Sequence, residues 1–278
     1  MIAIAIAVQG ADGSESLQLQ FDRAVSAKGE AYFTLRSNIL AWGASAVPFL
    51  TEQASSTNLH ARVLARAMLS WTAQPELNRR RTELIERALS PRISSHLPRI
   101  SAVLGETGGS SAYGTFTPPQ EDELRRKDAV PFLLEMVLKG PSDTQRPAFK
   151  EGVWARCFAA GLVGWYTGPD VVPVLAEELG SGDGKMPVAA VAGLGCARTY
   201  AAVEPLLGAL SAQNDDVRAS AYVALMDITG QDFRKGRILH TPPVTSDEIT
   251  DAVREQFRAW WQDNKARLLG MPAPQEKK

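Results

Sequence analysis

The residues that could carry chemistry in this 278-residue chain are few and widely spaced. The two cysteines, Cys157 and Cys196, form no CxxC pair, so their spacing predicts neither a disulfide scaffold nor a zinc site. The three histidines, His60, His96 and His240, are also far apart and match no metal-ligand spacing. The sequence therefore predicts no catalytic residue, no metal and no cofactor, and we expect the protein not to be an enzyme.

Two short segments resemble catalytic motifs without completing them. GASAV at residues 43–47 lacks the second glycine of the GxSxG nucleophile elbow, and no strand is predicted before it. GETGGSSAYG at residues 105–114 lacks the GK[ST] ending of a phosphate-binding loop. We interpret Ser45 as a helix cap and residues 105–120 as an irregular loop.

Residue types that are typical of binding surfaces recur at one spacing. Arg62 and Arg218 each lie seven residues before a leucine that ends an alanine-rich segment, and Arg66 and Tyr222 each lie three residues before it. Residues four apart share a helix face, and arginine and tyrosine are enriched at protein-binding hot spots. We therefore predict that Arg62, Arg66, Arg218 and Tyr222 contact a partner protein. The alternative is that the arginines are ordinary solvated side chains.

Composition narrows the classes of partner. The chain has 30 Lys and Arg residues against 31 Asp and Glu, so net charge gives no reason to bind nucleic acid or an acidic membrane. No stretch reaches the roughly 18 apolar residues that a membrane span requires. The segment from Ile2 to Ala11 resembles a truncated secretory signal that lacks its positive region, so cytoplasmic and exported locations both stay open.

The elements that would position these side chains repeat along the chain. AVPFL occurs at residues 46–50 and again at 129–133, and VVPVL (171–175) and VEPLL (203–207) are related segments. Proline is tolerated in the first turn of a helix, where backbone N–H groups have no intrahelical partner, so each segment predicts a helix start. Three residues before the proline, three of the segments carry good N-cap residues, which we predict to be Ser45, Asp128 and Asp170. Thr199 is the predicted cap for VEPLL.

A second, alanine-rich helix follows each proline segment. ARVLARAML, WARCFAAGL, PVAAVAGL and VRASAYVAL end at Leu69, Leu162, Leu194 and Leu225, and WARCFAAGL follows an insertion. Their small and apolar residues recur at the spacing of a closely packed helix. Eleven residues before three of these leucines lie the predicted caps Asn58, Asp183 and Asn214. One helix pair cannot bury both of its apolar faces alone, so the repeats predict a stack of pairs.

These segments resemble short bacterial HEAT-like repeat proteins, the type also found in phycobilisome lyase subunits. The same resemblance is seen in DDVRASAYVAL and in ALMDITGQDF followed by FRAWWQ. The resemblance covers residues 29–100 and 127–230, and the repeat register is open between Arg79 and Phe116. It implies an all-α, right-handed α-solenoid (superhelix) of stacked antiparallel helix pairs, HEAT/armadillo-like.

The same reading divides the chain into three parts. We expect a flexible or signal-like segment at 1–14, one solenoid at 15–268 with irregular loops near 105–120 and 230–245, and a polar tail at 269–278. Ser246 is the predicted cap of the last helix, in which Trp260 or Trp261 would cover the open end of the stack.

The expected function is a non-catalytic HEAT-repeat scaffold or adaptor that binds a partner protein along the second-helix, concave face. The identity of that partner cannot be read from the sequence. One alternative is a subunit of an enzyme such as a bilin-lyase-like protein, which only the resemblance implies. Another is a nucleic-acid-binding helical-repeat protein, which the balanced charge disfavours.

Overall fold

The fold is described from a computed structural model that covers residues 16–88, 123–124, 126–140, 153–181, 185–234 and 244–270. Within these residues the chain forms twelve α-helices and several short 3-10 helices, and no strand. The expectation of an all-α chain is therefore confirmed. The predictions for residues 1–14, for the loop at 105–120, and for Asp183, His96 and His240 lie outside the described residues.

The first four helices form a group, which we call the N-terminal unit. It consists of α1 (Leu17–Ser26), α2 (Gly29–Leu40), α3 (Val47–Gln53) and α4 (Leu59–Ala73). Helices α1, α2 and α3 all pack on α4. Their buried side chains form one hydrophobic cluster, the N-terminal cluster, which includes Phe21, Tyr32, Ile39, Leu50, Leu64 and Met68.

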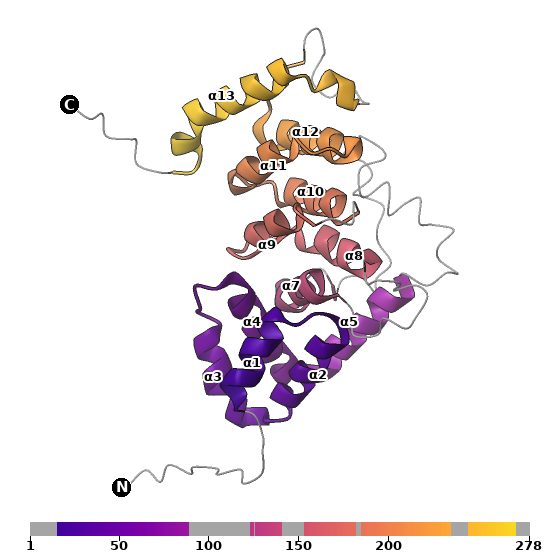
Figure 1. The fold of residues 1–278 in the computed structure, drawn as a ribbon, viewed down its shortest axis with the longest axis vertical. Coiled ribbons are helices and arrows are strands. Elements are labelled where there is room, and N and C mark those ends of the chain that lie inside the picture. Colours follow the sequence, from indigo (N-terminus) through magenta and orange to yellow (C-terminus); the bar gives the residue numbers. More distant parts are fainter. Residues whose placement is uncertain are drawn as a thin grey trace, which may run out of the picture.

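The remaining helices form a second group, which we call the C-terminal unit. It begins with α5 (Pro75–Ala88) and continues with α7 to α13. Its bounds are α7 (Val130–Lys139), α8 (Val153–Val163), α9 (Val171–Glu178), α10 (Lys185–Ala197), α11 (Val203–Ala209), α12 (Asp215–Thr229) and α13 (Asp251–Leu268). Helices α7, α8, α10 and α12 pack in succession, and α9 and α11 lie against α10 and α12 (Figure 1). A second cluster of buried side chains, the C-terminal cluster, joins these helices.

The last helix closes one end of the stack. In Figure 1, α13 lies across the end at which α11 and α12 are found. Its Phe257 and Trp261 are buried in the C-terminal cluster, whereas Trp260 is partly buried against it. The expectation that one of the two adjacent tryptophans covers the stack end agrees with this burial, because a terminal repeat must shield its apolar face.

The repeated prolines and the second-helix caps lie where the sequence predicts. Pro48, Pro131, Pro173 and Pro205 all fall in the first turn of an α-helix. Asn58 caps α4 by accepting a hydrogen bond from the Ala61 N–H at 3.1 Å. In α12 the equivalent Asn214 accepts from the N–H groups of Asp216 and Val217, at 2.9 and 3.2 Å.

The predicted caps of the first helices are wrong. Ser45 and Asp128 lie inside 3-10 helices, Gly43–Ala46 and Lys127–Ala129, that run directly into α3 and α7. Asp170 precedes α9, but its backbone is helical (φ −96°, ψ −15°) and its side chain makes no cap bond. A capping side chain needs an extended backbone to reach back to the first N–H groups, and a 3-10 lead-in removes that geometry.

Two other predicted caps can be compared with the structure. Thr199 does cap, but it caps the 3-10 helix Tyr200–Ala202 that leads into α11. Ser246 is not the cap of the last helix, because it lies inside the 3-10 helix Ser246–Glu248. Thr245 caps that 3-10 helix in a capping box with Glu248, and Thr250 caps α13 through the Val253 N–H.

Contact between backbones positions the middle of the C-terminal unit. A Cβ added to Gly164, at the end of α8, would lie 2.3 Å from the carbonyl oxygen of Gly193 in α10. A Cβ on Gly193 would lie 2.7 Å from the carbonyl oxygen of Ala160. Real Cβ atoms do not approach that closely, so α8 and α10 can pack at this distance only because both positions are glycine.

Candidate functional site

The first two residues predicted to bind a partner are part of an internal ion-pair group, which we call the Asp170 clamp (Arg62, Arg66 and Asp170). Asp170 is only 4% exposed. Arg62 Nε donates to Asp170 Oδ1 at 2.7 Å, and Arg66 Nη1 donates to Asp170 Oδ2. The clamp therefore holds α4 of the N-terminal unit against the start of α9. The Arg66 side chain keeps 39% exposure and the Arg62 side chain 22%.

Arg218 on α12 makes the same kind of contact as Arg62 on α4, three helix pairs later. Arg62 Nη1 donates to the Ser56 carbonyl oxygen at 2.6 Å, and Arg218 Nη1 donates to the Ala212 carbonyl oxygen at 2.6 Å. In both cases the acceptor lies six residues earlier, in the connection between the two helices of a pair. The common spacing that motivated the prediction thus reflects a shared structural contact that joins the second helix to its preceding loop.

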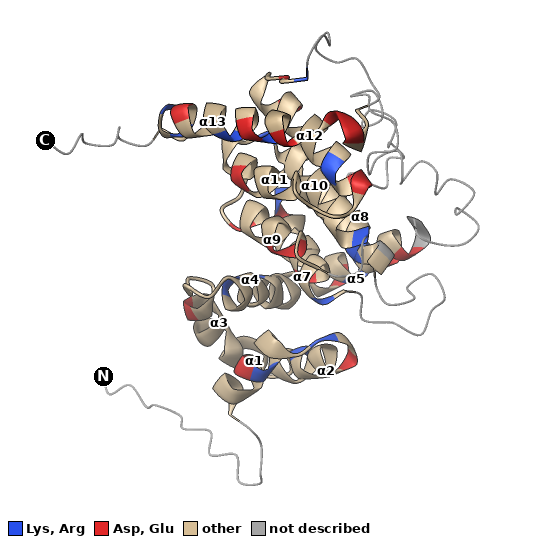
Figure 2. Ribbon diagram, turned by 45° about the horizontal axis from the view of Figure 1, so that its top comes forward, with Lys and Arg blue, Asp and Glu red and all other residues tan. Residues whose placement is uncertain are grey.

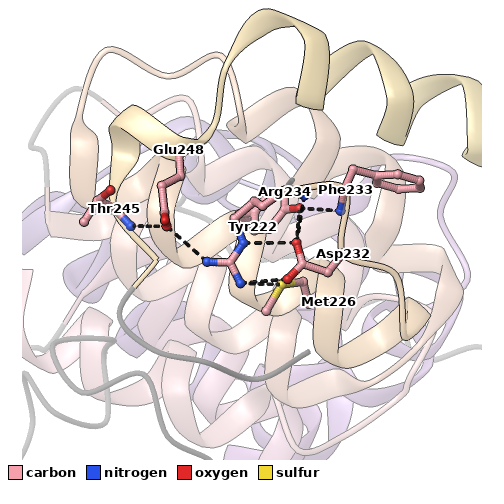
Figure 3. Close-up of polar contacts among 7 residues, drawn as sticks. All are labelled: Tyr222, Met226, Asp232, Phe233, Arg234, Thr245 and Glu248. Carbon is pink, nitrogen blue, oxygen red and sulfur yellow. Dashed lines mark hydrogen bonds and ion pairs between the residues drawn. The ribbon is translucent and has the colours of Figure 1, made fainter. Parts of the chain in front are cut away.

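Tyr222, the fourth predicted residue, is not on the surface. Its side chain is fully buried, its hydroxyl donates to Asp232 Oδ1 at 2.8 Å, and the same hydroxyl accepts from the Phe233 N–H at 2.9 Å (Figure 3). Burial raises the pKa of Tyr222, so the phenol stays protonated. The expectation that Tyr222 contacts a partner is corrected here, because the chain that follows α12 covers the ring.

Arg234 completes this second group, which we call the Tyr222 cluster (Tyr222, Asp232, Arg234 and Glu248). Its guanidinium pairs with Asp232 Oδ2 at 2.7 Å and with Glu248 Oε2 at 3.1 Å (Figure 3). Burial alone would raise the pKa of Asp232, but hydrogen bonds from Arg234 and Tyr222 lower it below its ordinary value. The cluster is a closed set of matched donors and acceptors that ties the end of α12 to residues just before α13.

Arg81, on α5, forms a comparable buried contact that joins this helix to Asp128. Its side chain is fully buried and donates to Asn78 Oδ1 at 2.8 Å and to Asp128 Oδ2 at 2.9 Å. The neighbouring Arg80 pairs with Glu123 at 3.1 Å. Asp128 and Asp170 occupy the same place, three residues before the repeated proline, and both bind arginine from an earlier helix instead of capping their own.

A third polar group, the Glu135 junction (Tyr32, Arg36, Trp71 and Glu135), was not predicted from the sequence. Glu135 on α7 is 2% exposed. Its carboxylate accepts from the Tyr32 hydroxyl at 2.5 Å, from Arg36 Nη1 at 3.1 Å and from Trp71 Nε1 at 2.8 Å. One carboxylate thus binds two helices of the N-terminal unit. The available signal was a single acidic residue inside the apolar run VPFLLEMVLK.

Aromatic rings and a buried lysine surround this junction. The Arg36 guanidinium lies 4.8 Å from the Phe33 ring centre and 4.6 Å from the Trp71 ring centre, both cation–π distances. Lys139 donates to the carbonyl oxygens of Val25 and Ala27, both at 2.7 Å. Burial lowers the pKa of Lys139 to about 8.

A small cavity adjoins Arg36. It measures about 20 Å³ and is lined by Phe33, Arg36, Trp71, Thr82, Phe132, Glu135, Met136 and Gly140. That volume holds a water molecule and no organic substrate. Arg36 Nε is buried and has no hydrogen-bond partner among the described residues, so a water bound in the cavity would satisfy it.

The remaining observations concern ions and membranes. His60 contacts Glu177 on α9 at 2.9 Å, beside the Asp170 clamp. Among the described residues no group of three or more His, Cys, Asp and Glu side chains could hold a metal ion. In the same part of the chain, no helix combines the length and apolar character that crossing a membrane requires. Figure 2 shows basic and acidic positions interspersed along the helices of both units.

Comparison of the chain with models of protein families, with curated proteins and with solved structures found no match. The function must therefore be argued from the repeats and the polar groups themselves. The Asp170 clamp, the Glu135 junction and the Tyr222 cluster are all bonded within the chain. The partly exposed arginines Arg62, Arg66 and Arg218 are what remains of the predicted binding face.

Proposed function

We propose that this chain is a non-catalytic scaffold, a right-handed α-solenoid of HEAT-like helix pairs that binds a partner protein along the face of its second helices. The observation that carries the proposal is the equivalence of α4 and α12. Both helices begin at an asparagine cap. In both, an arginine side chain donates a hydrogen bond to the backbone carbonyl oxygen six residues earlier. Equivalent second helices are the basis of the continuous binding surface of repeat proteins.

The proposed binding face has fewer accessible side chains than the sequence alone suggests. Tyr222 is buried and contributes no contact. Most residues of α10 are buried as well, so the middle of the face offers few side chains. Arg66, with 39% of its side chain exposed, is the most accessible of the three predicted arginines. Its guanidinium has donors beyond those that bind Asp170 and Ala54, which a partner carboxylate would accept.

The test begins with capture from an extract of the source cell and identification of the bound proteins. The affinity of the purified partner is then measured by calorimetry for the wild-type protein and for two variants. Arg66→Gln removes the exposed guanidinium while Arg62 still neutralises Asp170. Arg258→Gln is the matched control, because Arg258 on α13 is 40% exposed and is also in an ion pair.

We expect Arg66→Gln to weaken binding about tenfold, as loss of a hot-spot arginine does, and Arg258→Gln to leave it within about twofold. Equal affinities for all three proteins would remove the second-helix face from the proposal. Capture of no protein would contradict the scaffold function. Capture of a tetrapyrrole-carrying protein, followed by a shift in its visible spectrum, would favour the lyase-subunit alternative instead.

A further inference from the structure

We infer that the Glu135 junction and the Asp170 clamp form a hinge, at which the N-terminal unit opens away from the C-terminal unit while each unit keeps its own core. The inference goes beyond the scaffold function, because it gives the molecule a moving part whether or not a partner binds. It rests on where the two hydrophobic clusters meet and on the chemistry of the contacts between them.

The two cores are separate, and α4 divides them. Ala61, Leu64, Ala65 and Met68 on one side of α4 belong to the N-terminal cluster. Val63, on another side, belongs to the C-terminal cluster. The described chain passes from one unit to the other through Gln74, between α4 and α5. Each unit therefore buries most of its own apolar side chains, and α4 is the wall that they share, since its Val63, Leu59 and Trp71 pack on the C-terminal cluster.

The side-chain bonds across this wall are mainly polar. Donors of the N-terminal unit bind Glu135 and Asp170, His60 contacts Glu177, and Lys139 donates back to two carbonyl oxygens at the end of α1. Apolar contacts also cross it, because Val63 is buried in the C-terminal cluster, Leu59 packs against that cluster, and the Trp71 and Phe132 ring centres are 5.9 Å apart. Within the two cores most packed side chains are apolar, and the C-terminal unit also buries polar side chains such as Arg81 and Arg234.

Polar and apolar contacts respond differently to opening. A buried ion pair gains Coulomb energy, but the loss of hydration offsets most of that gain, so water can replace the partner at small net cost. Exposing apolar side chains has no such compensation. Interfaces between units that are more polar than a core are the ones at which relative motion is expected. The wall at α4 should therefore open before either core unfolds.

Groups inside the closed hinge reduce its stability further. Arg36 Nε is buried with no partner among the described residues. The Lys139 ammonium is buried between α1 and α7, where Lys28 repels it, Glu135 attracts it, and the Tyr32 ring lies 5.1 Å away. Burial lowers the pKa of Lys139, which shows that the closed state disfavours the charged lysine. Opening would rehydrate both groups.

The test measures distances in the full chain by pulsed electron paramagnetic resonance. One label pair joins the units, at Leu19→Cys on α1 and Glu255→Cys on α13, which are both exposed positions. The reference pair lies within the C-terminal unit, at Asp216→Cys and Glu255→Cys. The native cysteines are replaced by Cys157→Ala and Cys196→Ser. Each pair is measured in low and in molar salt, with and without Asp170→Asn, which removes the charge that Arg62 and Arg66 share.

We expect a second, displaced distance for the joining pair, with a population that rises at least fivefold in high salt or with Asp170→Asn. The reference pair should not change. Asp215→Asn, which breaks an exposed ion pair within α12, is the control and should leave both distances unchanged. A single fixed distance for the joining pair under all conditions would overturn the hinge. Equal changes in both pairs would also overturn it, because they would show unfolding of the whole chain.

Discussion

Two sets of helices in the same all-helical chain are joined by opposite means. Between α8 and α10 the backbones touch at Gly164 and Gly193, and no atom can be added. Between α2 and α7, and between α4 and the start of α9, long side chains reach across and end in ion pairs. The first contact depends on shape and excludes water. The second depends on charge, and water can replace each partner. Related sequence segments therefore form similar helices without being joined to their neighbours in the same way.

One repeat position shows this difference in a single residue type. Glu135 and Glu177 both lie four residues after a repeated proline. The Glu135 side chain is 3% exposed and holds three donors, whereas the Glu177 side chain is 49% exposed and contacts His60. The environment, and not the place in the repeat, decides whether this glutamate is structural.

The largest effect should come from the shape-dependent contact. Gly164→Ala would place a methyl group against the carbonyl of Gly193, and the backbone would have to shift. Overpacking of this kind costs about 3 kcal/mol in the free energy of unfolding. Gly161→Ala is the matched control, because nothing lies within 4 Å of the added Cβ, and it should stabilise by about 0.5–1 kcal/mol. Urea unfolding checks both values, and equal effects would contradict close packing at Gly164.

Removing the central charge of the junction should have the next largest effect. Glu135→Gln leaves Arg36 buried between two rings without a carboxylate, which should cost about 2 kcal/mol of stability. The same substitution at the equivalent exposed position, Glu177→Gln, should change stability by less than about 0.5 kcal/mol. Denaturant unfolding of both variants measures the contrast, and similar losses at the two positions would remove the distinction drawn between them.

The Tyr222 cluster offers a test of one buried hydroxyl, which donates to a charged carboxylate and accepts from a backbone N–H. Tyr222→Phe keeps the buried ring and its contact with Phe257, but it leaves Asp232 and the Phe233 N–H without the hydroxyl. We expect a loss of about 1–1.5 kcal/mol in thermal or urea unfolding. No loss would mean that Arg234 alone holds the segment after α12.

The smallest effect should be a pH dependence from Lys139. Burial is the main cause that lowers its pKa from 10.5 to about 8. Between these values the unfolded chain binds more protons than the folded one, so this residue makes stability rise with pH there and fall as pH drops through about 8. The free energy of unfolding of the wild type minus that of Lys139→Met should increase as the pH is raised from about 8 to 10.5. A difference that does not vary with pH would contradict the lowered pKa.

Sequence patterns located the elements better than the contacts between them. Proline in a first turn and the Asn58 and Asn214 caps depend on a few neighbouring residues, so the helix starts could be predicted. The partner of Asp170 lies more than a hundred residues away, on α4, and no local pattern distinguishes an aspartate that caps from one that binds arginine. The prediction that Tyr222 is exposed was also wrong. The segment that follows α12 covers this position, although helix spacing alone places it on the surface.

The buried arginines Arg81 and Arg234 have a consequence for how this chain tolerates inserted sequence. Arg81 joins α5 to Asp128, and Arg234 joins the end of α12 to Glu248, so each pins both ends of a stretch whose length the helices do not set. Once the ends are pinned, lengthening the stretch costs only loop-closure entropy, about 0.6 kcal/mol for each doubling. We therefore expect a reporter domain inserted in either stretch to leave the described helices unchanged.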